Sequence, residues 1–321
     1  MKKFLFFGMV FFLLLSVVSC KKKPKEERWE DTLTTGIIRI ACDENFKNLM
    51  DAEIDAFQAH NNYLAIINPI YTNESEVIRL LLTDSVRLAL VTRDLNEQEQ
   101  KEAKDKQMFV RKFLIAFDGI ALIANKANPD SLISFPMIQK ILTGEITKWS
   151  QINPKSSLDT IRVIFDSNQS GILRYVVDSI TKSESLSPNL YALNNSDELI
   201  NKVCELPNAI GIIGFNILSE NRWKASDLQE KLRLMYIDSY LPYAGDIKNE
   251  NYPLWRPIYV LLSDPRSAGL SSGFSIFLAH DVGQTVILKS GLLPAVSDPQ
   301  NRSVNIVNDY PNENKEKQNN K

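Results

Sequence analysis

The chain has 321 residues, of which 44% are hydrophobic, and its 37 Lys and Arg nearly balance 39 Asp and Glu, for a formal charge of −2. This is the composition of an ordinary globular protein. The charge balance excludes a broad basic face of the kind that binds nucleic acid, so we expect no nucleic-acid partner. A chain of about 300 residues usually forms two domains or one large one.

The N-terminus has the pattern of a secretory signal. Lys2 and Lys3 precede an apolar run of 15 residues, Phe4 to Val18, which is short for a transmembrane helix of about 20 residues. The run ends in Val-Val-Ser-Cys, which resembles a bacterial lipobox. Residues 1–19 are therefore predicted to be a signal peptide and Cys20 the lipidated first residue of the mature chain. An uncleaved anchor and an ordinary signal peptide are the alternatives.

Both ends of the remaining chain are polar. Residues 20–35 are rich in charged side chains and contain a Pro, which is typical of a tether, so we expect a lipid-anchored linker there. Residues 309–321 have almost no apolar content and are predicted to be a disordered tail.

Between these ends, apolar runs with strand character alternate with helical patterns. Strands are expected at 36–42, 64–71, 87–91, 108–116, 119–125, 160–165, 209–215 and 256–262. Helices are expected at 46–60, 75–84, 96–106, 135–144, 172–180 and 196–206, with one or two more in 270–291. This alternation predicts an α/β fold made of βαβ units with mostly parallel sheets.

Catalytic and metal-binding patterns are missing from the sequence. The two histidines, His60 and His280, have no nucleophile near them in the sequence, and no nucleophile elbow, P-loop or HExxH motif occurs. The sequence contains no cluster of Cys and His residues of the kind that binds zinc. Cys42 and Cys204 can either pair or stay free thiols. We expect no enzyme activity, no metal and no cofactor.

Four predicted strands are each followed by a short polar turn that contains natural helix N-cap residues. In open parallel sheets, ligands bind beyond the carboxyl ends of the strands, where helix N-termini present free amides. The turns together predict a cleft for an anion or a small polar solute, whereas plain helix capping is the alternative for each turn alone. The four turns are Asp43–Phe46, Thr72–Ser75, Thr92–Leu95 and Asp166–Gly171.

Arg93 lies at the end of a predicted strand, within one of these turns. An unpaired cation at that place would point into the cleft and hold an anion. The alternative is that Arg93 forms an ion pair with Asp94, Glu74 or Asp118.

Several segments of the chain resemble those of a known family. "FDGIALIANKANP" (117–129) looks like its crossover segment, and "ILTGEITKWSQI" (141–152) is very similar to a stretch that follows it. "VTRDLNEQE" (91–99), "SNQSGILRY" (167–175) and "SGLLPA" (290–295) are weaker matches. Through these segments the chain resembles the type II periplasmic solute-binding proteins, and within them the phosphate-binding lipoproteins of ABC phosphate importers.

The resemblance implies two α/β lobes, each a mostly parallel sheet flanked by helices, joined by two hinge crossovers. Residues 36–117 and 255–308 would form one lobe and residues 118–254 the other. The protein would be an extracytoplasmic, membrane-anchored lipoprotein. It would capture phosphate or a related small oxyanion between the lobes and deliver it to the subunits of an ABC permease, without chemistry. We expect it to be a monomer.

The family's ligand contacts come from the first three strand turns and from the Ser-Gly turn. Two acids are added to the candidate set, one in the crossover and one just before the Ser-Gly turn. The candidate ligand-binding residues are Asp43, Asn45, Phe46, Asn73, Glu74, Thr92, Arg93, Asp118, Asp166, Asn168, Ser170 and Gly171.

The sequence departs from the family pattern at the site. Phosphate binders commonly carry an Arg where Asp166 stands and a Thr where Ile172 stands, and the turn after the first strand here contains two acids, Asp43 and Glu44. One carboxylate could accept the proton of a monohydrogen phosphate and so reject sulfate, but three carboxylates do not fit that role.

Two other functions therefore stay open. The fold could have lost its anion and act as a sensor or a protein-interaction module. Alternatively, the cleft could bind a cationic or zwitterionic solute, for which the carboxylates would be favourable.

Overall fold

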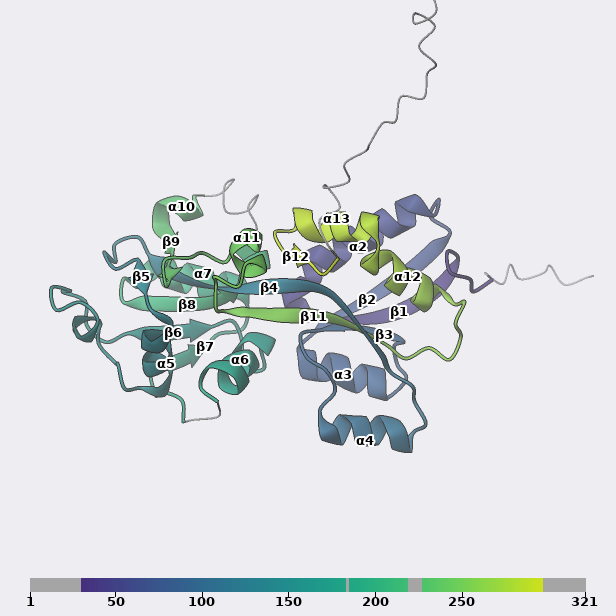
Figure 1. The fold of residues 1–321 in the computed structure, drawn as a ribbon, viewed down its shortest axis with the longest axis horizontal. Helices are drawn as coiled ribbons and strands as arrows, with labels where there is room; N and C mark the ends of the chain where they lie inside the picture. The colour runs from purple at the N-terminus through teal and green to yellow at the C-terminus, as the bar shows by residue number, and fades with distance from the viewer. Residues whose placement is uncertain (1–29, 183–184, 219–226, 297–321) are drawn as a thin grey trace, which may run out of the picture.

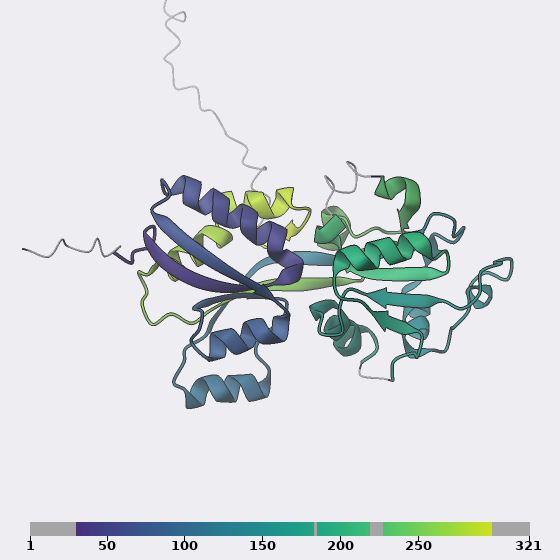
Figure 2. The ribbon, with the colours of Figure 1, turned by 180° about the vertical axis from the view of Figure 1, so that it is seen from behind.

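The computed structural model describes residues 30–182, 185–218 and 227–296. These residues form two α/β lobes on either side of a pair of long strands (Figures 1 and 2). The predicted signal peptide, Cys20 and the C-terminal tail lie outside the described residues. Among the described residues, no helix combines the length and the apolar character that crossing a membrane requires.

The first lobe is built on three parallel strands, β1 (Gly36–Asp43), β2 (Ala65–Thr72) and β3 (Leu88–Val91). Apolar residues that alternate along β1, such as Ile38 and Ile40, pack against Phe57 and Phe274 of the covering helices. The other elements of this lobe are η1 (Glu44–Phe46), α2 (Lys47–His60), α3 (Glu74–Leu82), α4 (Glu97–Asp105), α12 (Leu270–Ala279), α13 (Asp281–Lys289) and β12 (Leu293–Pro294).

The second lobe is built on the parallel strands β6 (Arg162–Phe165), β7 (Leu190–Ala192) and β8 (Ala209–Gly214). Trp149 is fully buried in its core, and Gly211 lies where a Cβ would be 2.8 Å from Ile123. Its other elements are β5 (Leu132–Ile133), α5 (Phe135–Thr143), η2 (Trp149–Gln151), α6 (Gly171–Tyr175), η3 (Val176–Ile180), α7 (Ser196–Glu205), α8 (Phe215–Leu218), α10 (Leu228–Lys231), β9 (Leu232–Leu234), β10 (Tyr236–Ile237) and α11 (Ala244–Lys248).

Two antiparallel strands connect the lobes, β4 (Arg111–Asn125) and β11 (Trp255–Leu262). The prediction of separate strands at 108–116 and 119–125 is wrong, because β4 runs through Asp118 without a break. The polar residue is tolerated in mid-strand because Arg256 of β11 lies opposite it in the register.

The sheet therefore continues through the hinge in the order β2-β1-β3-β11-β4-β8-β6-β7. The pairs that cross between the lobes are antiparallel, whereas the pairs β1–β2, β1–β3, β6–β7 and β6–β8 are parallel. The predicted α/β fold class is confirmed. The residue boundaries predicted for the two lobes stay a prediction.

Both cysteines in the described residues are free, which decides the alternative left open by the sequence. Cys42 lies at the end of β1 in one lobe and Cys204 lies on α7 in the other.

Glu53 on α2 is a buried acid, and neither of its carboxyl oxygens has a hydrogen-bond partner among the described residues. Burial raises its pKa from the ordinary value of 4.5 to about 9. Because the folded-state pKa is the higher one, folding favours the protonated carboxyl. The stability that this form contributes is complete below pH 4.5 and is lost as the pH rises toward 9.

Replacing Glu53 by Met should therefore raise the free energy of unfolding at pH 7 by about 2 kcal/mol, because an unpartnered buried polar group is removed. Urea unfolding at pH 5, 7 and 9 measures this, and the gain over the wild type should grow with pH. Glu97→Met, at an exposed acid on α4, is the control and should change stability little. An equal gain at all three pH values would show that folding does not raise the pKa of Glu53.

Candidate functional site

The four polar turns lie at strand ends that face each other across the hinge. In the first lobe Asp43 ends β1 and Thr92 directly follows β3, whereas in the second lobe Ser170 caps α6 and Gly171 begins it. Asp43, Thr92 and Ser170 are all buried. The fold brings Asp43, Thr92 and Gly171 close together, while their role in binding a ligand stays a prediction.

The same turns also cap their helices, as the alternative interpretation expected. The side chain of Asn73 accepts a hydrogen bond from the Glu76 amide at 3.0 Å, and Ser170 accepts one from the Ile172 amide at 3.0 Å. Asp43 uses only one carboxyl oxygen, Oδ1, which accepts from the Asn45 amide at 3.1 Å. Capping therefore leaves the second oxygen of Asp43, Oδ2, without a partner among the described residues.

Three polar atoms surround one point beside Gly171. A Cβ built on this glycine would be 3.1 Å from Asp43 Oδ2, 3.2 Å from Arg256 Nη1 and 3.4 Å from Thr92 Oγ1. Arg256 Nη1 is buried and, like Asp43 Oδ2, lacks a hydrogen-bond partner among the described residues. Buried polar groups are nearly always paired, so this acceptor and this donor indicate a place for a polar group that joins them.

Arg256 is the cation of the site, and the sequence analysis missed it. Its side chain is fully buried on hinge strand β11, where Nε and Nη2 donate to Asp118 Oδ2 at 3.1 and 3.0 Å. Its guanidinium also lies over the ring of Phe46, 5.1 Å from the centroid. The one sequence signal was an Arg inside the otherwise apolar strand "WRPIYVLL", where a charge is buried only if it is paired.

Arg93 does not point unpaired into the site, so that interpretation is wrong. Both terminal nitrogens donate to the Glu99 carboxylate, at 2.6 and 2.8 Å, and Nε lies 3.7 Å from Glu74. Glu99 was not among its expected partners. It lies on the first turn of α4, where the capping box of Asn96 already holds its carboxylate.

The lobes contact each other across the site. Arg174 on α6 donates to the buried carboxylate of Glu74 at 2.7 Å and to the Thr92 hydroxyl at 3.0 Å. Asn73 of the first lobe donates to Gln169 of the second, and Asn216 donates to the backbone oxygen of Asn45. The described conformation is therefore a closed one.

The predicted residues divide into two groups by position. Asp43, Phe46, Thr92 and Gly171 lie next to Arg256, and Asp118 binds it directly. Glu74, Asn73 and Asn45 instead make the contacts between the lobes. Asn168 is exposed, and Asp166 is buried and accepts from the Ser167 amide at 3.0 Å.

Burial dominates the ionisation of the site. It raises the pKa of Asp43 to about 7, although the charge of Arg256 opposes this shift. Burial also raises the pKa of Asp166, against the hydrogen bond from Ser170. For Glu74 the effect of burial is outweighed by Arg174 and by the hydrogen bonds from Thr92, which hold its pKa below the usual value. Burial lowers the pKa of Arg256, but Asp118 and Asp43 outweigh this and raise it, so Arg256 stays a cation.

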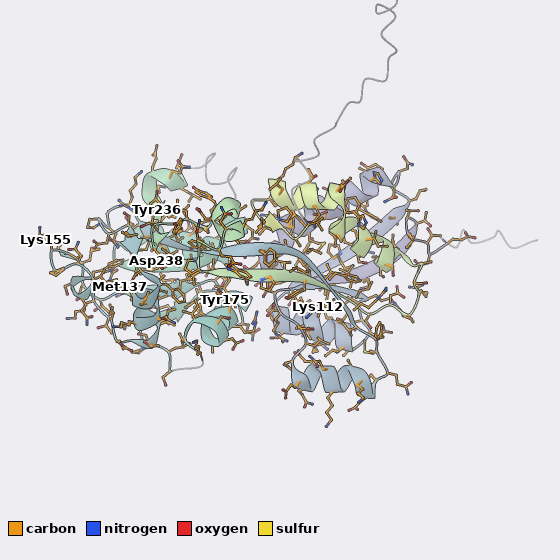
Figure 3. The ribbon with its side chains drawn as sticks, in the orientation of Figure 1. Lys112, Met137, Lys155, Tyr175, Tyr236 and Asp238 are labelled. Carbon is orange, nitrogen blue, oxygen red and sulfur yellow. The ribbon has the colours of Figure 1, made fainter. Side chains whose placement is uncertain are left out.

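Helix α6 is attached to the hinge by its last residue. Tyr175, labelled in Figure 3, lies beside β11, and its hydroxyl is hydrogen-bonded to the backbone of Trp255. The helix that presents Ser170 and Gly171 is thereby held against the strand that carries Arg256.

Comparisons with known proteins agree with this architecture. A family model described as a PBP superfamily domain matches residues 30–282. The phosphate-binding protein PstS of Staphylococcus aureus (strain bovine RF122 / ET3-1) is 21% identical over 207 residues, which are 63% of this chain and 62% of that protein. The chain thus matches less than two thirds of the length of this relative.

Two solved structures have the same fold. A phosphate ABC transporter substrate-binding protein from Clostridium perfringens, solved with bound phosphate, has a TM-score of 0.70 and 22% identity, over 81% of this chain and 100% of that one. An ABC-type phosphate transport receptor from Vibrio cholerae has a TM-score of 0.64 and 20% identity, over 81% and 100% of the two chains. The chain belongs to the PBP superfamily and has the fold of its type II phosphate-binding proteins.

Proposed function

We propose that the protein is an extracytoplasmic, lipid-anchored solute-binding protein that captures phosphate or a related small oxyanion between its lobes for an ABC importer. The observation that carries this proposal is a pair of buried atoms beside Gly171, Arg256 Nη1 and Asp43 Oδ2, that have no hydrogen-bond partner within the part of the chain that the structure describes. The phosphate-binding relatives and the closed two-lobed fold support it.

A protonated oxyanion satisfies both atoms at once. An oxygen that carries a proton can donate to Asp43 Oδ2 and accept from Arg256 Nη1 and from the Thr92 hydroxyl. Charge-assisted hydrogen bonds of this kind are shorter and stronger than neutral ones. Sulfate has no proton at neutral pH or above, so where Asp43 is ionised, above its pKa of about 7, a sulfate oxygen would face the lone pairs of Asp43 and the site should reject it.

The surrounding charges favour an anion of low charge. Four buried carboxylates, those of Asp43, Glu74, Asp118 and Asp166, surround the site, against the buried Arg256 and the partly exposed Arg174. Because unpaired charge is costly away from water, binding of a dianion should be accompanied by uptake of a proton. The raised pKa of Asp43, about 7, places this uptake near neutral pH.

The work proposed is binding and delivery, without catalysis. Within residues 30–182, 185–218 and 227–296, no group of three or more His, Cys, Asp or Glu is arranged to hold a metal ion. The proposed anchor, Cys20, would keep the lobes next to a permease. Release of the ligand requires only that the contacts between the lobes, such as Arg174 with Glu74, break.

Titration calorimetry of the dialysed residues 30–310 with phosphate tests the proposal, and a pH series sharpens it. We expect saturable binding at pH 7, with an affinity that falls by up to about tenfold per pH unit above pH 7, since one proton is taken up on binding. The free Asp43 carboxyl, whose pKa is about 7, is ionised in that range, so the proton must come from solution.

Sulfate at pH 9 is the control and should give no binding heat there, because the Asp43 carboxyl is ionised at that pH and has no proton to donate. Absence of phosphate binding at every pH from 5 to 9 would remove the oxyanion proposal. In that case the surplus of buried carboxylates would favour the second candidate, a binder of a cationic or zwitterionic solute. A thermal shift with such a solute would distinguish it from a sensor or interaction module that has no small ligand.

A further inference from the structure

The two hinge strands have two different faces. The side chains of Asp118 and Arg256 lie opposite each other in the register and point into the site. Their neighbours Phe117 and Trp255 point to the other face, because successive side chains of a strand alternate. The rings of Phe117 and Trp255 meet edge to face there, with centroids 5.3 Å apart.

A pocket of about 600 Å³ lies on this second face. Its floor includes the rings of Phe117 and Trp255, and its walls come from both lobes. One wall is α11, with Ile247, and the other is formed by α13 and β12, with Leu288 and Leu293. In Figure 1 these walls stand above the β4–β11 hinge, whereas α6 and α3, which exchange the Arg174–Glu74 contact, lie below it.

This arrangement couples the pocket to the site. A rotation of the lobes that separates α6 from α3 would bring α11 toward α13 and β12, because the two pairs of elements lie on opposite sides of the β4–β11 hinge. Opening of the site would then narrow the pocket. A molecule in the pocket would act as a wedge that opposes opening.

We propose that this pocket behind the hinge is a second binding site, that it takes a small uncharged apolar molecule, and that its occupation tightens ligand binding on the opposite face of the hinge. The size of the pocket is that of a site for an organic molecule of one to three rings. By linkage, the ligand in the cleft and the molecule in the pocket then raise each other's affinity by the same factor.

The chemistry of the pocket indicates the class of its occupant. Phe117, Trp255, Leu288 and Leu293 offer carbon surface to its body. At the exposed rim, Lys248 and Glu250 carry opposite charges, so the mouth has no net charge that would select an anion or a cation. The occupant should accordingly be mainly apolar and carry no net charge.

Gly245 provides a variant that fills the pocket without a clash. It lines the pocket on α11, and a Cβ at this position meets no atom within 4 Å. In Gly245→Trp the indole should occupy the pocket, act as the wedge itself and exclude other occupants. Asn249→Trp places the same side chain at an exposed position just after α11, outside the lining residues, and is the matched control.

N-phenyl-naphthylamine, an uncharged apolar dye whose fluorescence rises in apolar surroundings, is the probe, used with the mature full-length chain. We expect saturable binding that phosphate tightens about fivefold or more. Gly245→Trp should lose dye binding and bind phosphate more tightly, with Asn249→Trp behaving as the wild type. The tightening by phosphate rests on the proposed function, so phosphate binding is measured separately by calorimetry, without dye.

Several results would overturn the proposal. They are no saturable dye binding, dye binding that Gly245→Trp leaves unchanged, and dye binding that phosphate weakens. Dye binding only after removal of residues 297–321 would also overturn it, since the chain itself would then fill the pocket. A protein that gives no calorimetric heat with phosphate can still be tested with the dye alone. If dye binding then lowers the radius of gyration in small-angle scattering, the result supports the pocket and rejects only the proposed oxyanion.

Discussion

The double variant Arg256→Gln, Asp118→Asn is expected to lose phosphate binding by at least about a hundredfold and to remain folded. The loss follows because Arg256 Nη1 is the buried donor that faces the proposed oxyanion position, and an amide offers no positive charge there. One charge-assisted hydrogen bond of up to about 3 kcal/mol accounts for a loss of about a hundredfold.

The second substitution in this variant protects the fold. Arg256→Gln alone would leave Asp118 buried without its partner, at a cost of about 3–5 kcal/mol in the free energy of unfolding. Replacement of both partners leaves no uncompensated buried charge, so it should cost less than the removal of one partner. Thermal unfolding by circular dichroism should therefore show a large loss for the single variant and a small one for the double variant.

Arg93→Gln is the matched control for this experiment. Arg93 is also an arginine near the site, but Glu99 already holds both of its terminal nitrogens. Its replacement should leave phosphate affinity within a few fold of the wild type. Strong binding by the double variant, or loss of binding in Arg93→Gln with a preserved fold, would show that the cation of the site is not Arg256.

Gly171→Ala is expected to reduce phosphate affinity about a hundredfold or more, while it changes the free energy of unfolding by no more than about 1 kcal/mol, because the gain in helix propensity and the close contacts of the new methyl group oppose each other. The added methyl group would stand 3.1 Å from Asp43 Oδ2 and 3.2 Å from Arg256 Nη1, and would crowd the space beside Gly171 that is proposed for the ligand oxygen. Gly171 begins α6 with an ordinary backbone conformation, and Ala is the better helix former. The variant therefore separates occupancy of the site from folding.

Calorimetry and thermal unfolding of the same preparation measure both effects. The control is Gly245→Ala, at a position where a Cβ meets open space, and it should bind phosphate about as well as the wild type. Wild-type affinity in Gly171→Ala would mean that the ligand does not approach this glycine, and the proposed position beside Asp43 and Arg256 would then be wrong.

The origin of the cation distinguishes this chain from the pattern of the family that it resembles. An acid, Asp166, stands where an Arg was expected before the Ser-Gly turn, and it is buried with its own hydrogen bonds to Ser167 and Ser170. The positive charge instead comes from the hinge strand β11, through Arg256. A ligand held there would contact one of the two strands that connect the lobes.

Local patterns in the sequence were enough for much of the fold. The alternation of strands and helices placed most elements, because hydrophobic periodicity and capping residues act over a few positions. Gly144, predicted to end a helix, does so in a left-handed conformation, with φ of 89°. The polar turns could be located from the sequence as well, because a strand end followed by Asn73 or Ser170 is a local signal.

The sequence by itself thus determined the fold class, the polar turns at the strand ends and the likeness to a family. Only the tertiary structure decided which charges meet. Arg256 and Asp118 are 138 residues apart in the chain, and so close a pairing depends on the register of β4 against β11. The pairing of Arg93 with Glu99, six residues away, could not be predicted from the sequence either, because several acids lie within reach of a long side chain. Periodicity and capping are properties of neighbouring residues, whereas the partner of a buried charge depends on the packing of the whole chain.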